Sequence, residues 1–256
     1  MLTFPNRVLN QSGYERNAAQ RGDALALLQS LPNGCTPLVF FDPQHRDTLD
    51  RLAYGNEGAR QRRRSKLPAM TGEYIDMCCH EIARVLRPGG YLMLWVDDYQ
   101  LCEGRYLSLN PVLPSVSLCA WDKGVPGNGY RFRSRGDHLI ARQKPLFVGK
   151  SRKPRLPAKS TWRDHGIPNR WAEKVSRKGH PHAKPFVLTK LLIGAVTKPG
   201  DLVVDPAAGG FTVMHAALAL GREFVGCDIA HDPTKAQQAV DYLRDLALRE
   251  PAQAAE

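Results

Sequence analysis

The chain has 256 residues, with 36 Lys and Arg against 25 Asp and Glu and a formal net charge of +11. Its 43% apolar and 24% charged content is that of an ordinary globular protein, which excludes collagen-like and wholly disordered chains. No apolar run approaches the roughly 18 residues of a membrane span, and no secretory signal is visible near the N-terminus. The six Cys residues lack CxxC spacing, which disfavours structural zinc and a disulfide framework and leads us to expect a reducing cytoplasm.

The positive charge is concentrated in one stretch. Residues 131–184 contain 16 Lys and Arg against three acidic residues, interleaved with aromatic side chains such as Trp162 and Trp171. A shorter run, Arg60–Lys66, adds five more basic residues. Segregated basic charge of this kind favours a polyanion partner, most often nucleic acid. A solvated basic face or linker is the alternative, and charge alone does not separate the two.

The first half of the chain alternates between helical and strand patterns. Apolar spacing and an acidic start predict a short helix over 23–31, and a wholly apolar run predicts a buried strand over 38–41 that ends at Asp42-Pro43. A second helix is expected over 71–86, with Thr71 as its N-cap. The sequence Arg87-Pro-Gly-Gly ends that helix, and short strands are expected at 91–95, 116–121 and 138–142.

The second half opens with a segment, 146–179, that has little periodicity and many Pro and basic residues. This composition is typical of a loop-rich insert that becomes ordered on a partner. Regular patterns then return as a helix at 186–196, a strand at 202–205, a helix at 212–220 and a strand at 223–228. Strand, helix and strand in succession predict a right-handed parallel crossover and therefore an α/β fold.

A glycine-rich turn, Asp205-Pro-Ala-Ala-Gly-Gly-Phe-Thr212, joins two of these elements. Glycines at such a turn let the backbone approach a ligand and expose the N-terminus of the next helix. Asp228, at the end of the following strand, is placed to accept hydrogen bonds from ribose hydroxyls. The turn lacks the G-x-G-x-x-G of dinucleotide folds, and the acidic Asp205 suits a cationic ligand better than a pyrophosphate. S-adenosylmethionine, with its amino group and sulfonium, fits that preference.

The order of motifs resembles the amino-group DNA methyltransferases, which modify adenine N6 or cytosine N4. The matching segments are Gly22-Asp23, Asp42-Pro43, His180-Pro-His-Ala-Lys-Pro185, Pro199-Gly-Asp-Leu-Val-Val-Asp205 with the turn that follows, and Gly221-Arg-Glu-Phe-Val-Gly-Cys-Asp228. The resemblance implies a Rossmann-like S-adenosylmethionine-dependent methyltransferase fold, a mostly parallel sheet with helices on both faces. It also implies a single domain over 1–256, in which a catalytic block (20–145) precedes the insert and a cofactor block (180–230), the permuted β order of that family.

The resemblance also implies roles for the cofactor-binding residues. Asp205, Gly209 and Thr212 match positions that hold the methionine end of the cofactor, and Lys184 and Pro185 match positions near its carboxylate. Asp228 is expected at the ribose and Asp23 beside the adenine. Two cofactor positions depart from the family pattern: Ala207 replaces a Phe, and Phe211 replaces a Gly. A bulky side chain at 211 is expected to alter how closely the turn wraps the ligand.

The family's catalytic motif is D-P-P-[YF], and this chain has Asp42-Pro43-Gln44-His45. Asp42 and the Pro43 carbonyl are expected to accept the two hydrogens of the substrate amine and align it with the sulfonium. His45 takes the place of the aromatic residue that stacks on a flipped base, and Gln44 adds an amide at the base edge. Because Asp is the first residue of the motif, we favour adenine N6 over cytosine N4. No Cys lies in a Pro-Cys setting, which disfavours cytosine C5 chemistry.

The expected partner is DNA, most simply duplex DNA. The DNA-binding candidates are Arg60, Arg62, Arg63, Arg64, Lys66, Arg131 and Arg133. No metal site and no membrane contact are expected, and both monomer and homodimer remain open. The alternatives are a catalytically silent DNA-binding relative, in which the altered motif and turn are vestigial, and an RNA methyltransferase.

Overall fold

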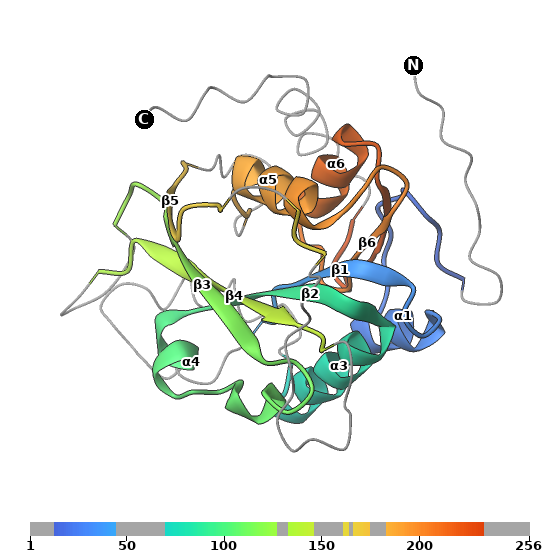
Figure 1. The fold of residues 1–256 in the computed structure, drawn as a ribbon, viewed down its shortest axis with the longest axis horizontal. Helices are drawn as coiled ribbons and strands as arrows, with labels where there is room; N and C mark the ends of the chain where they lie inside the picture. The colour runs from blue at the N-terminus through green and yellow to red at the C-terminus, as the bar shows by residue number, and fades with distance from the viewer. Residues whose placement is uncertain are drawn as a thin grey trace.

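The computed structural model describes residues 13–44, 70–126, 133–145, 161–163, 166–174 and 183–232. Its centre is a seven-stranded sheet in the order β5-β3-β4-β2-β1-β6-β7 (Figure 1). The strands are β1 (Thr36–Phe41), β2 (Leu86–Val96), β3 (Ser115–Asp122), β4 (Gly136–Gln143), β5 (Arg170–Ala172), β6 (Leu202–Asp205) and β7 (Glu223–Gly226). Only β4 runs against its neighbours, so the expectation of a mostly parallel sheet is confirmed.

Helices cover both faces of the sheet, as expected (Figure 1). The helices α1 (Ala24–Ser30) and α3 (Gly72–Val85) lie on one face, and α5 (Phe186–Val196) and α6 (Thr212–Ala219) lie on the other. Strand β1 is buried on both sides because Val39 and Phe41 pack with α1 and α3, whereas Leu38 and Phe40 pack with α5 and α6. This double burial explains the wholly apolar sequence of the strand.

Both helices of the first half begin where the sequence predicts. The Asp23 side chain accepts a hydrogen bond from the Ala26 N–H at 2.9 Å and caps α1. The Thr71 hydroxyl accepts one from the Tyr74 N–H at 3.2 Å and caps α3. One face of α3 is apolar and buried; it comprises Ile75, Cys78, Cys79, Ile82 and Val85.

Three details differ from the sequence prediction. Strand β2 begins at Leu86, before Arg87-Pro-Gly-Gly, because the chain passes directly from α3 into the sheet with a register shift against β1. Gly90 is required there, since a Cβ would lie 2.8 Å from the Pro37 carbonyl oxygen. The insert contributes a strand, β5, that pairs in parallel with β3. A short helix, α4 (Asp98–Cys102), and a 3-10 turn, η2 (Leu107–Leu109), follow β2 without a predicted counterpart.

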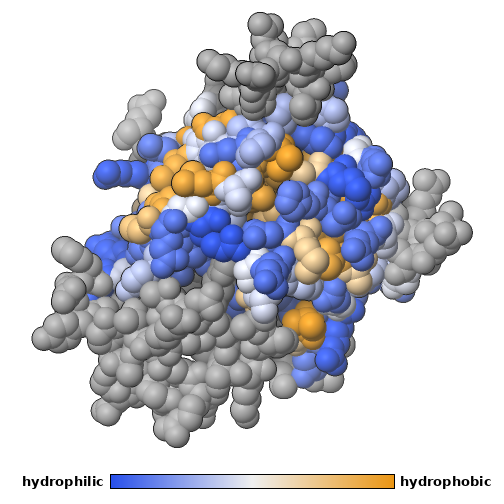
Figure 2. Space-filling model, turned by 90° about the horizontal axis from the view of Figure 1, so that it is seen from below, coloured by the Kyte–Doolittle hydropathy of each residue, from blue (hydrophilic) through white to orange (hydrophobic). Residues whose placement is uncertain are grey.

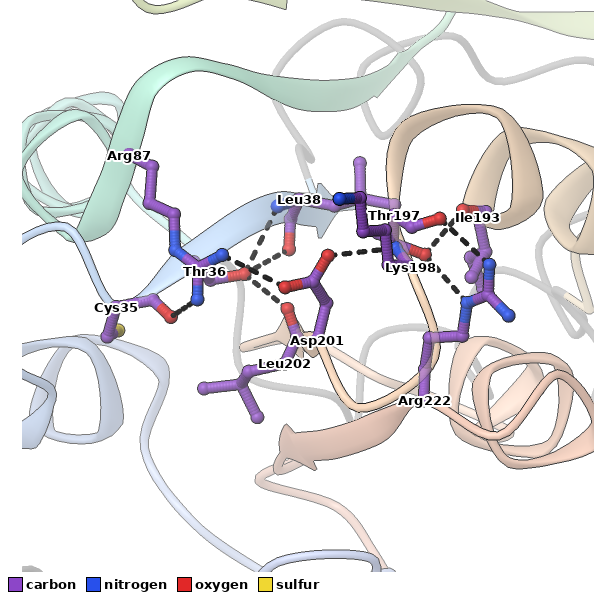
Figure 3. A network of polar contacts seen from close by, with 10 residues as sticks. All are labelled: Cys35, Thr36, Leu38, Arg87, Ile193, Thr197, Lys198, Asp201, Leu202 and Arg222. Carbon is purple, nitrogen blue, oxygen red and sulfur yellow. Dashed lines mark hydrogen bonds and ion pairs between the residues drawn. The ribbon is translucent and has the colours of Figure 1, made fainter. Parts of the chain in front are cut away.

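The amino ends of β1 and β6 are joined by a polar network (Figure 3). The buried Thr36 hydroxyl donates to the Leu202 carbonyl at 2.6 Å and accepts from the Leu38 N–H at 3.1 Å. Beside it, Arg87 at the start of β2 pairs with Asp201 at 2.9 Å. Ligands bind at the opposite, carboxyl ends of the strands in folds of this kind, so we assign this network to stability.

The face in Figure 2 is the side on which α3 and α4 lie in Figure 1, and its apolar side chains form separate groups between polar ones. Singly exposed apolar residues such as Met77 on α3 are ordinary on a protein surface. In the part of the chain that the structure describes, no helix has the length and apolar content needed to cross a membrane.

Thr36→Val tests the network because it keeps the shape of the side chain and removes the hydroxyl. Two buried backbone groups then lose a partner, and we expect the free energy of unfolding in urea to fall by about 1–3 kcal/mol. Ser117→Val, at an exposed position of β3, is the control and should change it by less than about 0.5 kcal/mol. A Thr36→Val protein as stable as the parent would contradict the assignment.

Candidate active site

Three predicted site carboxylates meet at the carboxyl ends of neighbouring parallel strands. Asp42 follows β1, Asp205 ends β6, and Asp228 lies two residues beyond β7. Val39 is paired with Val204 and Asp205 with Gly226, so the strand ends lie side by side. The order of strands also changes direction here. The chain leaves β1 toward β2 through α3 on one face, and leaves β6 toward β7 through α6 on the other. Ligands of doubly wound sheets bind at such a switch point.

Asp205 lies at the centre of this group and is only 5% exposed. Burial raises the pKa of its carboxyl well above the usual range, and the neighbouring Asp42 and Asp228 carboxylates raise that pKa further. The Ala207 N–H, which donates to Oδ1 of Asp205 at 3.2 Å, and the positive charge of Lys184 offset part of this effect. The pKa nevertheless stays well above its usual range, so the site around Asp205 suits a cationic ligand such as an ammonium or sulfonium group.

The described residues contain no group of three or more His, Cys, Asp and Glu side chains that could hold a metal ion. The glycine-rich turn instead has the form of a backbone cradle. Gly209 has a φ of +50°, and its N–H donates to Oδ2 of Asp228 at 3.1 Å, which joins the turn to the end of β7. Helix α6 begins directly after the turn with Thr212, and its N-cap residue supplies no side-chain hydrogen bond.

Phe211 keeps the backbone shape of the glycine that it replaces. Its φ is +56°, in the left-handed region that a bulky residue rarely adopts. The side chain is only 3% exposed and packs into the core, edge-on to Phe224 at 6.4 Å between ring centroids. How closely the turn wraps a ligand stays a prediction. The ring also contacts His231, at 4.9 Å between centroids. Burial of the ring compensates for the strained backbone, a state that usually persists only where the surroundings enforce it.

The residues expected at the adenosine end are also connected. Asp228 accepts hydrogen bonds from the N–H groups of Gly209 and, at 2.8 Å, Ala230. The carbonyl of Asp228 accepts from the Gly22 N–H at 3.3 Å, which brings Asp23 close by. Oδ2 of Asp23 accepts from the Tyr74 hydroxyl at 2.6 Å, so this side chain ties α1 to α3 besides capping α1.

Lys184 makes a contact that the sequence does not predict. Its ammonium lies 3.0 Å from Oδ2 of Asp42 and 3.3 Å from Oδ2 of Asp137 on β4. The same Asp137 oxygen pairs with Lys123 at 2.9 Å. Burial alone would lower the pKa of Lys184, but the two carboxylates outweigh burial and hold that pKa above its ordinary value. Burial alone would raise the pKa of Asp137, and Lys184 and Lys123 reverse this and hold it below its ordinary value.

Two buried tryptophans contact the ammonium groups of Lys184 and Lys123. The Lys184 ammonium lies 4.9 Å from the ring centroid of Trp95, and the Lys123 ammonium lies 4.9 Å from that of Trp121. The two indole rings meet edge to face at 5.8 Å. Both Trp residues belong to the core, and each is 3% exposed. Cation–π contact additionally restricts where the two ammonium groups can lie.

Glu173, in the insert, fixes the start of α5. Its carboxylate accepts hydrogen bonds from the N–H groups of Val187 at 2.9 Å and Leu188 at 3.1 Å, and from the indole N–H of Trp171 at 2.8 Å. The N-cap residue of α5 is Pro185, which has no side-chain acceptor, so a carboxylate from another segment does this work. Glu173 thereby fixes the position from which Lys184 reaches Asp42.

The remaining candidates are only partly described. Pro43 is buried, and the carbonyl of Gln44 accepts from the Met70 N–H at 3.3 Å. Arg133 is exposed. His45, Arg131 and the whole Arg60–Lys66 run lie outside the described residues. Trp162 and Trp171, the aromatic residues that we associated with nucleic-acid binding, are half-buried and pack against the core.

Asp205→Asn tests the charge balance of the site. A carboxyl whose pKa is higher in the folded than in the unfolded chain makes the folded state lose stability as pH rises above the unfolded value of about 4. The amide removes that penalty and can still accept from Ala207. We expect the Tm of the ligand-free protein at neutral pH to rise by about 2–4 °C, the shift that roughly 1 kcal/mol gives at this size, while S-adenosylmethionine binding weakens.

The control for this prediction is Asp201→Asn, the same change at the other end of β6. It removes an ion pair with Arg87 and should lower the Tm. A fall in Tm for Asp205→Asn as well would show that Asp205 stabilises the ligand-free fold.

Comparisons with known proteins identify the family. The DNA methylase family model for N6 and N4 enzymes matches residues 69–238. The type II methyltransferase M.HhaII of Haemophilus parahaemolyticus is 42% identical over 216 residues, covering 83% of this chain and 91% of the relative. The DNA adenine methyltransferase YhdJ of Escherichia coli K12 is 48% identical over 249 residues, covering 85% of this chain and 80% of the relative.

Two solved structures share the fold. The cytosine-N4-specific PvuII DNA methyltransferase superposes with a TM-score of 0.60 at 15% identity, over 93% of this chain and 88% of that one. The M1.HpyAVI–SAM complex gives a TM-score of 0.56 at 16% identity, over 88% of this chain and 97% of that one. The family match and the two relatives above 40% identity lead to one conclusion: the chain belongs to the N6-adenine/N4-cytosine family of S-adenosylmethionine-dependent DNA methyltransferases.

Proposed function

We propose that this chain, as one methyltransferase domain, methylates the N6 amine of adenine in duplex DNA, on a base turned out of the helix. One observation supports this most strongly. Asp42, at the first position of the catalytic motif, directly follows β1. Asp205, whose pKa is raised by burial, ends the adjacent parallel strand β6. The acceptor for the substrate amine therefore lies next to the binding place for the positively charged part of the cofactor.

The proposed chemistry is alignment. S-adenosylmethionine supplies an electrophilic methyl group on its sulfonium. Asp42 accepts one hydrogen of the amine and the Pro43 carbonyl accepts the other, which turns the nitrogen lone pair out of conjugation with the ring. Holding two reactants in line supplies most of the rate in such a displacement. Gln44 and His45 are proposed to contact the edge and the face of the extruded base.

The cofactor residues are proposed to divide along its length. Asp205 pairs with the α-amino group, and Gly209 and Thr212 line the methionine end with Ala207 and the backbone of Phe211. Asp228 and Asp23, which are linked through Gly22, lie at the ribose and the adenine. Pro185 shapes the entry to the site at the start of α5.

Adenine N6 is favoured over cytosine N4 by Asp42 at the first motif position and by the similarity to YhdJ, which is named as a DNA adenine methyltransferase. Cytosine N4 is the second candidate, because the same clamp holds any exocyclic amine and PvuII methyltransferase shares the fold. We further propose a cytoplasmic location, which suits six cysteines that are all free thiols.

Transfer of a tritiated methyl group to duplex DNA tests the function. After digestion to nucleosides, mass spectrometry should find N6-methyladenine. Asp42→Asn should lower transfer by at least about 100-fold, a loss typical of removing a group that stabilises the transition state, with S-adenosylmethionine binding retained. Asp122→Asn, which changes an exposed ion pair with Arg135, is the matched control and should keep the parent rate.

Three results would contradict the proposal. Labelled N4-methylcytosine would overturn the choice of base. Full transfer by Asp42→Asn would overturn the role of Asp42, and binding of DNA without any transfer would favour a silent relative.

The proposed partner predicts a steep dependence of DNA affinity on salt. Each neutralised phosphate contributes a slope of about −0.9 to log K against log salt concentration. Replacing the five basic residues of Arg60–Lys66 with Gln should therefore flatten the slope measured by fluorescence anisotropy. An unchanged slope would indicate that these basic residues form a solvated surface and do not contact DNA.

A further inference from the structure

The two oxygens of the Asp42 carboxylate have different surroundings. Oδ2 lies 3.0 Å from the Lys184 ammonium. Within the part of the chain that the structure describes, no hydrogen bond or ion pair engages Oδ1. The side chain is 36% exposed, against 16% for Lys184. Among the described residues, one oxygen is thus paired with a cation and the other is not, and the side chain as a whole is partly exposed.

We propose that Lys184 is a positioning residue for Asp42: its ammonium occupies Oδ2, fixes the plane of the carboxylate and leaves Oδ1 as the acceptor for the base amine. The inference rests on the proposed function, because it assigns a geometry to the same clamp. It differs from the role that the family resemblance implies for Lys184, which is a place beside the carboxylate of the cofactor.

The position of Lys184 is itself held by the strands β3 and β4. Asp137 pairs with Lys184 at 3.3 Å and with Lys123 at 2.9 Å, both through Oδ2. The charges therefore alternate from Asp42 through Lys184 and Asp137 to Lys123, and the chain of four groups has no net charge. Trp95 lies under the ammonium of Lys184 at 4.9 Å. An ammonium with a carboxylate on two sides and an indole beneath has little freedom to leave Oδ2.

The charges around the site favour the ion pair between Lys184 and Asp42. Asp42 and Asp228 both raise the pKa of the buried Asp205, and the positive charge of Lys184 lowers it. The contacts with Asp42 at 3.0 Å and with Asp137 at 3.3 Å place the Lys184 ammonium between these two carboxylates.

Lys184→Met tests the inference because it keeps the length of the side chain and removes its charge. Loss of the fixed acceptor geometry should lower kcat by about 10- to 100-fold, the range that misplacement of about 1 Å produces. The KM for S-adenosylmethionine and the calorimetric Kd should change by less than about threefold. If Lys184 binds the carboxylate of the cofactor instead, the KM and Kd rise and kcat is kept, which would overturn the inference.

Asp137→Asn is the milder second variant, useful if Lys184→Met does not fold. It should lower kcat in the same direction but less, and the double variant should be no slower than Lys184→Met alone, because Asp137 acts only through Lys184. Additive losses in the double variant would overturn this chain of contacts. Asp122→Asn, the same change on the neighbouring strand, is the control.

A thermal-denaturation cycle over the same variants needs no substrate. Non-additive shifts in Tm for Lys184→Met and Asp137→Asn are expected, and additive shifts would contradict the pairing. This measurement distinguishes a failure of the proposed function from a failure of the inference about Lys184. If the parent chain transfers no methyl group but the cycle shows coupling, the proposed function fails while the contact stands. If transfer is present and kcat of Lys184→Met stays within about twofold, the inference alone fails.

Discussion

Repulsion between carboxylates at one edge of the sheet is the constraint on which the site depends. Parallel strands β1, β6 and β7 end side by side, and each is followed or closed by an aspartate. The protein neutralises two of them with its own groups. Lys184 pairs with Asp42, and two backbone N–H groups bind Asp228. Asp205 is buried, and among the described residues its carboxylate accepts one hydrogen bond, from the Ala207 N–H. Lys184 only partly offsets the rise in its pKa. In the proposed function, the cationic cofactor balances this carboxyl.

The two ends of the sheet therefore serve different purposes. At the amino ends, Thr36 and Arg87 contact Leu202 and Asp201 through satisfied polar contacts. At the carboxyl ends, the first and second halves of the chain meet through Asp42 and Lys184. Both meetings are possible because β1 and β6 are neighbours in the sheet although far apart in the chain. The polar contacts at the amino ends of β1 and β6 thus stabilise the fold that holds the charged groups together at the carboxyl ends of these strands.

Local patterns in the sequence were enough for most of the elements and for part of the site. The acidic start of α1 at Asp23, the cap of α3 at Thr71 and the glycine turn each depend on neighbouring residues, and the structure has them where expected. Strand β5 was missed because three residues in a basic segment carry no periodicity, and their pairing with β3 is set by tertiary contact. The pair between Lys184 and Asp42 joins segments more than 140 positions apart, and a sequence pattern holds no signal for such a distance.

Phe211 and Glu173 illustrate a second limit. The motif position of Phe211 indicated a change in the turn, but only the structure shows that the ring is turned into the core while the backbone keeps the left-handed form. Glu173 looked like one acid in a basic run. Its role at the start of α5 depends on the insert returning to the sheet edge at β5. In both cases the sequence gives the residue type, but tertiary packing decides where the side chain points.

We propose that the positively charged cofactor balances the buried carboxyl of Asp205. Calorimetric titration with S-adenosylmethionine, in buffers of different ionisation enthalpy from about pH 5 to pH 8, measures the protons exchanged on binding. Because burial and neighbouring carboxylates raise the pKa of Asp205 in the ligand-free protein, binding of a cation should release a proton from it. The account predicts proton release that grows as pH falls below the raised pKa and disappears in Asp205→Asn. Binding without proton release at any pH in the range, or equal release by the variant, would contradict it.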